Sequence, residues 1–215
     1  MTALTRRGML LVAATLRLRA ADSEFWNRKD PSEWSADEID RLITKSPWAK
    51  EITVLLQQSG QKRRGRAAAQ FNGVVRWESA KPVLEAMKAS LPGEFSNHYV
   101  ISVSGIPMSS LGPRNSESTG AEARARQREI EGVLDRIKSV TRLEAKGAAP
   151  AQPGIVQETP FGVGETRTML FGFSRSLLQL SLDNQEAGFV TQMGTIQVKA
   201  RFNLREMIYN SELAV

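Results

Sequence analysis

The strongest constraint on the fold lies near the C-terminus, where apolar and polar residues alternate strictly on both sides of Gly194. Successive side chains of a strand point to opposite faces, so this pattern predicts two strands, 188–193 and 195–202, joined by a tight turn at Gly194. The residues expected to face a core are Phe189, Met193, Ile196, Val198, Ala200 and Phe202, and those expected to face solvent are Gln192, Gln197, Lys199 and Arg201. The segment is therefore an antiparallel hairpin.

The rest of the chain predicts strands and helices that do not alternate regularly. Strands are expected at 52–58, 74–78, 98–103, 140–145, 168–173, 177–182 and 213–215. Helices are expected at 80–90, buried through Val83, Leu84, Met87 and Leu91, and at 121–139, packed only through its C-terminal half. A doubly wound sheet would need regular alternation. We therefore expect an α+β fold, with residues 21–215 as one domain that has an antiparallel or mixed β-sheet, packed helices and a flexible loop at 147–154.

Three further segments carry helix-start signals. Ser35 and Glu38 form a capping box ahead of an apolar stripe. Ser46 and Pro47 are a second candidate start, and Asn203 is expected to cap a short helix through Glu206. Four tryptophans are the largest candidates for either a ligand groove or the core, and we favour the core for Trp48 and Trp77.

Residues 1–20 have the features of a cleavable export signal. Arg6 and Arg7 precede a short apolar run, and small residues follow at Ala20 and Ala21. The paired arginines after Thr5 resemble the twin-arginine export motif, which implies recognition by the export machinery and a periplasmic or extracellular protein. The apolar run is too short for a stable membrane span, and the alternative is a cytoplasmic protein with an amphipathic first helix.

Cleavage changes the meaning of the basic charge. The full chain has 29 Lys and Arg against 23 Asp and Glu, a net charge of +6, and four of the arginines precede residue 21. The remaining chain is close to neutral, so the high charge is weak support for a nucleic-acid partner. The run Lys62, Arg63, Arg64 and Arg66 is nonetheless a candidate site for a polyanion or an anionic membrane, the alternative being a solvated loop.

The composition leaves little material for catalysis. The chain contains no cysteine and one histidine, which excludes thiol nucleophiles and thiolate or histidine-rich metal sites. His98 is the single candidate for histidine-based proton transfer, with Ser102 expected on the same face of its strand. The alternative is a histidine at a strand end. No cofactor and no metal site are predicted.

One family resemblance bears on location and fold. The segment beginning Phe25-Trp26-Asn27-Arg28-Lys29-Asp30-Pro31 and continuing through Ser46-Pro47-Trp48-Ala49-Lys50 resembles the opening of a group of uncharacterised exported acidobacterial proteins. The resemblance implies export and a single fold, and it carries no activity. The sequence thus favours an exported, non-enzymatic protein that binds another protein or a small molecule, with a hydrolase-like enzyme using His98 and a polyanion binder as alternatives.

Overall fold

Two antiparallel sheets form the body of the protein in the computed structural model, which describes residues 24–56, 69–107, 120–159 and 166–215. The larger sheet has the strand order β1 (Ala49–Leu56), β2 (Ala69–Trp77), β3 (His98–Pro107), β6 (Thr166–Ser174) and β5 (Ile155–Thr159). The smaller sheet has the order β4 (Arg142–Ala145), β7 (Glu186–Met193) and β8 (Ile196–Asn203). A two-stranded ribbon, β9 (Ile208–Tyr209) and β10 (Glu212–Leu213), follows. Together with the helices these sheets confirm the predicted single-domain α+β fold.

The hairpin predicted around Gly194 is confirmed. β7 and β8 pair antiparallel up to Met193 and Ile196, and Gly194 adopts a φ of 62° at the turn. All six residues predicted to face the core are buried, and all four predicted to face solvent are exposed. The alternation therefore predicted correctly which face of each strand meets the core.

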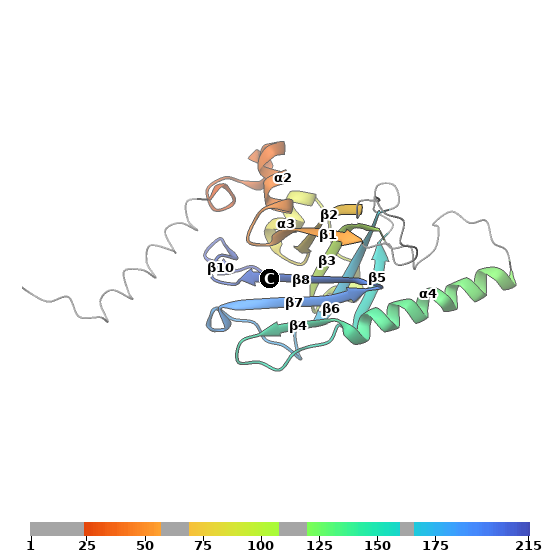
Figure 1. The fold of residues 1–215 in the computed structure, drawn as a ribbon. Coiled ribbons are helices and arrows are strands. Elements are labelled where there is room, and N and C mark those ends of the chain that lie inside the picture. The colour runs from red at the N-terminus through yellow and green to blue at the C-terminus, as the bar shows by residue number, and fades with distance from the viewer. Residues whose placement is uncertain (1–23, 57–68, 108–119, 160–165) are drawn as a thin grey trace, which may run out of the picture.

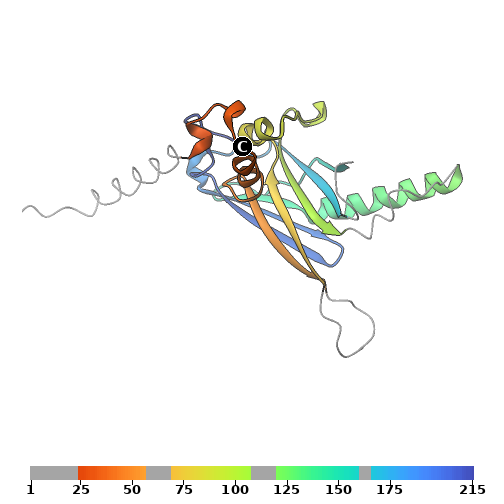
Figure 2. The same cartoon turned by 90° about the horizontal axis from the view of Figure 1, so that it is seen from above.

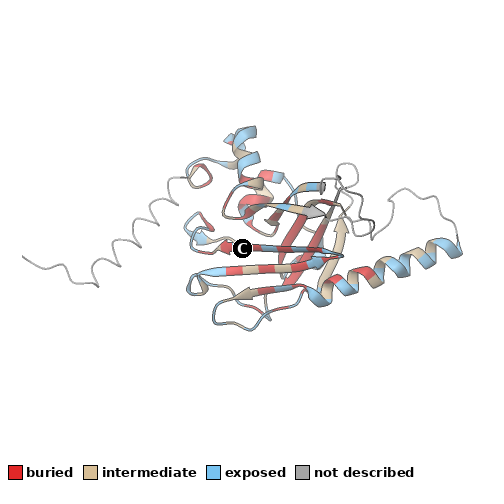
Figure 3. Cartoon of the chain, in the orientation of Figure 1, coloured by how far each residue is buried: buried red, intermediate tan, exposed pale blue. Residues whose placement is uncertain are grey.

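The core lies between the two sheets, where aromatic side chains from both meet edge to face. The ring centroids of Trp77 and Phe202 are 5.2 Å apart, and so are those of Phe171 and Phe189. Figure 3 shows many of the buried residues in the strands of the two sheets. At one side of this layered body β1 and β8 lie next to each other without ladder hydrogen bonds between them (Figures 1 and 2).

Helix α2 (Ala36–Thr44) begins as its capping box predicts. The Ser35 hydroxyl accepts from the Glu38 amide at 3.2 Å, and the Glu38 carboxylate accepts from the Ser35 amide at 2.9 Å. Leu42 is fully buried. The helix is thereby attached to the body by its apolar stripe.

Helix α3 (Lys81–Met87) is shorter than expected and buries a different set of residues. Pro82, Val83 and Ala86 are buried, whereas Met87 is 41% exposed. The prediction for Met87 was wrong because Lys88 takes a left-handed conformation with φ 49° and ends the helix there. A helix of two turns presents a narrower face than the predicted stripe.

Helix α4 (Ala121–Val140) packs only through its C-terminal half, as predicted. Val133 and Ile137 are its buried residues, and they face β5 and β7. The N-terminal half extends beyond the sheets in both views (Figures 1 and 2).

Two predicted helices are replaced by turns, one just before β1 and one just after β8. No helix begins at Ser46 and Pro47, since the Ser46 hydroxyl accepts from the Trp48 amide and the chain enters β1 at once. Trp48 is buried against the C-terminal residues, and its Nε1 donates to the Ala214 carbonyl at 2.7 Å. This contact holds the chain in the extended path that leads into β1. Asn203 caps no helix, because its side-chain amide closes a tight turn by accepting from the Arg205 amide and donating to Glu206.

Two regions of the C-terminal half also differ from the prediction. Residues 177–182 form no strand: Leu177 lies in solvent, 75% exposed, Leu178 is fully buried in the core, and Leu180 is partly buried against it. Strand β5 was not predicted. The predicted loop 147–154 joins β4 to β5, and Ala151 within it pairs with Leu143 through two backbone hydrogen bonds of 2.9 Å. Its flexibility stays a prediction.

Gly105 supplies the first testable prediction. The register of β3 against β6 shifts between Val103 and Ile106, and Gly105 sits in this irregularity with φ 77°. A Cβ at this position would lie 2.5 Å from the Asn72 carbonyl oxygen. Gly105→Ala is expected to lower the free energy of unfolding by about 2–4 kcal/mol, from backbone strain plus overpacking.

Urea unfolding measures this cost, and Gly147→Ala is the matched control. Gly147 also has a positive φ, 83°, but no atom lies within 4 Å of a Cβ built there. Equal losses in the two variants would contradict the proposed clash at Gly105.

Candidate functional site

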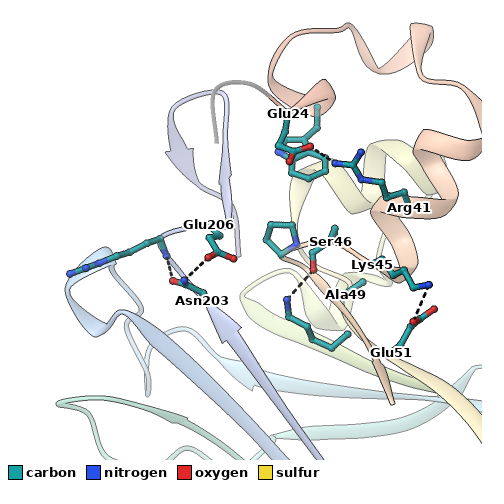
Figure 4. Close-up of a pocket in the computed structure, with 12 residues that line it drawn as sticks. Glu24, Arg41, Lys45, Ser46, Ala49, Glu51, Asn203 and Glu206 are labelled. Carbon is teal, nitrogen blue, oxygen red and sulfur yellow. Dashed lines mark hydrogen bonds and ion pairs between the residues drawn. The ribbon is translucent and has the colours of Figure 1, made fainter. Parts of the chain in front are cut away.

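A groove of about 560 Å³ lies where the N-terminal segment, the end of α2, the start of β1 and the turn after β8 meet (Figure 4). Its charged lining consists of four basic and three acidic side chains: Arg41, Lys45, Lys50, Arg205, Glu24, Glu51 and Glu206. Uncharged residues complete it: Trp26, Ser46, Pro47, Ala49 and Asn203. Pockets of this size are typical of small-molecule sites.

Aromatic packing holds the N-terminal wall of the groove in place. Trp26 is buried, and its ring meets that of Trp48 edge to face at 5.3 Å. The guanidinium of Arg41 lies 5.7 Å from the Trp26 ring centroid and pairs with the Glu24 carboxylate. The charges of Arg41 and Glu24 therefore neutralise each other. The Trp26 indole N–H has no acceptor in the described part of the chain, so this wall also holds an unused donor.

A second ion pair lies at the rim. Lys45 and Glu51 approach to 3.3 Å, and both side chains are more than half exposed. Exposed pairs of this kind contribute little to stability and neutralise each other locally. The charges of the groove that remain outside these two ion pairs are described next: those of Lys50 and Glu206.

Lys50 is the basic residue most enclosed by the groove. Its ammonium donates to the Ser46 carbonyl oxygen at 3.1 Å and forms no ion pair with a described carboxylate. The side chain is half-buried, and this desolvation lowers the pKa of Lys50, while the charge of Glu206 opposes the shift. An ammonium has three donors, so one hydrogen bond leaves donors for a ligand.

Glu206 lines the same groove from the turn that follows β8 (Figure 4), near enough to Lys50 for the two charges to interact. Its carboxylate accepts from the Asn203 amide at 2.8 Å and is held by that bond. Among the described residues Glu206 forms no ion pair with a basic side chain. The groove therefore presents a cation from the start of β1 and an anion from the turn after β8, neither of which forms an ion pair with a described residue.

The structure does not bring His98 and Ser102 together. Both side chains lie on one face of β3, as predicted, but buried Val100 stands between them, and four residues of strand span about 13 Å. The Ser102 hydroxyl is fully buried, and neither it nor His98 Nδ1 has a hydrogen-bond partner among the described residues. His98 lies outside the groove, and a catalytic role for it stays a prediction.

The other sequence-derived site residues lie outside the described ranges. These are Arg6 and Arg7 of the export signal and the basic run Lys62, Arg63, Arg64 and Arg66. Within the described residues, no three potential metal ligands of the carboxylate or imidazole type gather in one place. None of the described helices combines the length and the apolar character that crossing a bilayer requires.

No protein family, no curated protein and no solved structure matches this chain. Its function is therefore inferred from the chemistry of the groove.

The fold places Trp48 and Trp77 in the core as predicted, each fully buried.

Neither Lys50 nor Glu206 stands out in the sequence as a site residue. Lys50 stands at a strand start with ordinary neighbours, and Glu206 falls in a predicted helix that does not form. They meet only because β1 and β8 lie side by side, which local patterns do not specify. The one local signal was the cluster of tryptophans, since Trp26 and Trp48 build the wall behind them.

Proposed function

We propose that this protein is exported and acts outside the cytoplasm by binding a small ligand, without catalysing a reaction. The observation that carries the binding function is the groove at Lys50, where a half-buried ammonium forms no ion pair with a described carboxylate. Desolvating a charge costs free energy unless it is compensated, so an unpaired ammonium in a groove is suited to an anionic group of a ligand.

The groove residues support binding over catalysis. Ser46 is the only hydroxyl in the lining, and its side chain is occupied by the Trp48 amide. Lys50 donates to the Ser46 carbonyl, so the described contacts do not activate this hydroxyl as a nucleophile. The absence of an activated hydroxyl in the described lining favours binding over hydroxyl-based nucleophilic catalysis.

Export is tested with the paired arginines. The wild-type chain is expected to yield a periplasmic or secreted product that starts at Ala21 or Asp22, and Arg6→Lys with Arg7→Lys is expected to abolish it because twin-arginine recognition requires both guanidinium groups. Cell fractionation with N-terminal sequencing measures both results. An intact cytoplasmic product from the wild-type chain would overturn the export proposal.

Binding is tested by retention of small molecules. The full chain and its Lys50→Met variant are each incubated with an envelope extract, washed by gel filtration and analysed by mass spectrometry. A compound retained by the wild-type protein and lost from the variant supports the proposal. Identical sets of retained compounds, or none at all, would refute binding at this groove.

A further inference from the structure

We propose, on the basis of the binding function above, that the ligand of the groove is a small zwitterion whose carboxylate binds Lys50 and whose ammonium binds Glu206. Some charges of the lining are already neutralised in ion pairs within the protein. The charges that remain define the class of ligand by charge complementarity.

Two of the basic residues are already neutralised by acidic partners. Arg41 pairs with Glu24 beneath the N-terminal wall, and Lys45 pairs with Glu51 at the rim. Each pair presents nearly zero net charge to a molecule in the groove. Subtracting them leaves Lys50 and Glu206 as the facing charges, with exposed Arg205 beside Glu206.

Lys50 is prepared to receive a carboxylate. Its stem is half-buried, and the bond to the Ser46 carbonyl holds the ammonium in one place, so little side-chain entropy remains to be lost on binding. Charge-assisted hydrogen bonds to an ammonium are stronger than neutral ones. The carboxylate of the ligand replaces the solvation that Lys50 lost on folding.

Glu206 is prepared to receive a cation in the same way. The Asn203 amide holds one carboxylate oxygen at 2.8 Å, and the same Asn203 side chain accepts from the Arg205 amide at 3.1 Å. The turn after β8 thus sets the direction of the carboxylate. Lys50 and Glu206 attract each other across the groove without reaching ion-pair distance, which leaves space for a molecule with charges at both ends.

The surroundings disfavour a phosphate as the ligand. A dianion on Lys50 would be repelled by Glu206, the carboxylate of the lining that no described basic side chain matches in an ion pair. A zwitterion adds no net charge and gains from both Lys50 and Glu206. Pro47, which is partly exposed, supplies apolar surface for its carbon chain.

The test is isothermal titration of the full chain with defined probes. Glycine and 4-aminobutanoate are zwitterions of different length, acetate and butanoate are their counterparts without the ammonium, and inorganic phosphate is the multivalent anion. At least one zwitterion is expected to bind more tightly than its matched carboxylate. Lys50→Met is expected to weaken that binding about ten- to a hundredfold, the loss of one charged hydrogen bond.

Glu206→Gln separates the two ends of the ligand. It is expected to weaken the zwitterion but not the matched carboxylate, so that the advantage of the zwitterion disappears. Arg142→Met and Glu144→Gln, in an exposed ion pair outside the groove, are the controls and are expected to change affinity less than about twofold. Thermal unfolding of each variant establishes that it is folded.

Equal affinity for zwitterions and matched carboxylates, or tighter binding of phosphate, would overturn the zwitterion inference. So would binding that is unchanged in Lys50→Met. The retention experiment is independent of these probes. A compound of another class retained through Lys50 would leave the proposed binding function standing while the zwitterion inference falls.

Discussion

Trp77→Ala is expected to lower the free energy of unfolding by about 3–5 kcal/mol, because it removes a large side chain from the contact between the two sheets. Trp77 is fully buried, and its ring meets those of Tyr99 at 5.9 Å and Phe202 at 5.2 Å. These two neighbours belong to β3 of the larger sheet and β8 of the smaller sheet, which limits how far they collapse into the cavity. The cost is therefore close to the full cavity penalty.

Urea unfolding followed by tryptophan fluorescence and circular dichroism measures this loss. Leu177→Ala is the control, since Leu177 is 75% exposed and its truncation is expected to cost less than about 0.5 kcal/mol. A loss below about 1 kcal/mol in Trp77→Ala would show that the contact between the sheets is not the centre of the core.

Arg76→Met is expected to destabilise the fold by about 3–5 kcal/mol, because it leaves a buried carboxylate without its partner. The Arg76 and Glu78 side chains are 12% and 8% exposed, and Nε and Nη2 of Arg76 donate to one Glu78 oxygen at 3.0 and 2.5 Å. Arg76 Nη1 also donates to the Ile43 carbonyl at 3.3 Å, at the end of α2. The variant therefore loses an attachment between helix and sheet as well as the ion pair.

A double-mutant cycle distinguishes the stranded charge from lost packing. Arg76→Met combined with Glu78→Met is expected to be more stable than Arg76→Met alone, because no buried charge remains unpaired. Arg142 and Glu144 are the matched control, with the same spacing and type but side-chain exposures of 49% and 44%. Arg142→Met is expected to cost less than about 1 kcal/mol. Additive losses in the Arg76 and Glu78 cycle would show that the two side chains contribute independently and that no charge is stranded.

Local patterns in the sequence predicted the structure correctly where an interaction between residues close in the sequence determines it. The alternation around Gly194 determined both faces of β7 and β8, and the Ser35 and Glu38 pair located the start of α2. These signals act within a few residues. The long helix α4 was also located correctly, because its apolar positions recur only in the half that packs.

The predictions of secondary structure were wrong where residues distant in the sequence determine the local conformation. Ser46 and Pro47 have the composition of a helix start, but Trp48 is buried against the C-terminal residues and directs the chain into β1. The segment 177–182 is apolar enough for a strand, yet Leu178 is its one fully buried residue and Leu180 packs only partly buried against the core. Tertiary packing overrides local preference in both segments.

The groove could not be predicted because it has no local signature. Its facing charges come from the start of β1 and the turn after β8, and the helix expected at Glu206 would have placed this carboxylate differently. His98 is conspicuous in the sequence because its residue type is rare in this chain, whereas in the fold its ring lies edge-on to that of Phe95 and its strand partner is Ser174, away from the groove.

Competitive acetylation of lysines tests most directly whether the groove at Lys50 is a binding site. The full chain is treated with a trace of acetic anhydride, with and without envelope extract, and the rate at Lys50 is compared with that at exposed Lys146 outside the groove. The lowered pKa of Lys50 gives it a larger fraction of reactive neutral amine. A bound ligand is expected to slow acetylation at Lys50 and to leave Lys146 unchanged. An extract that changes neither rate, or slows both equally, would contradict the proposed site.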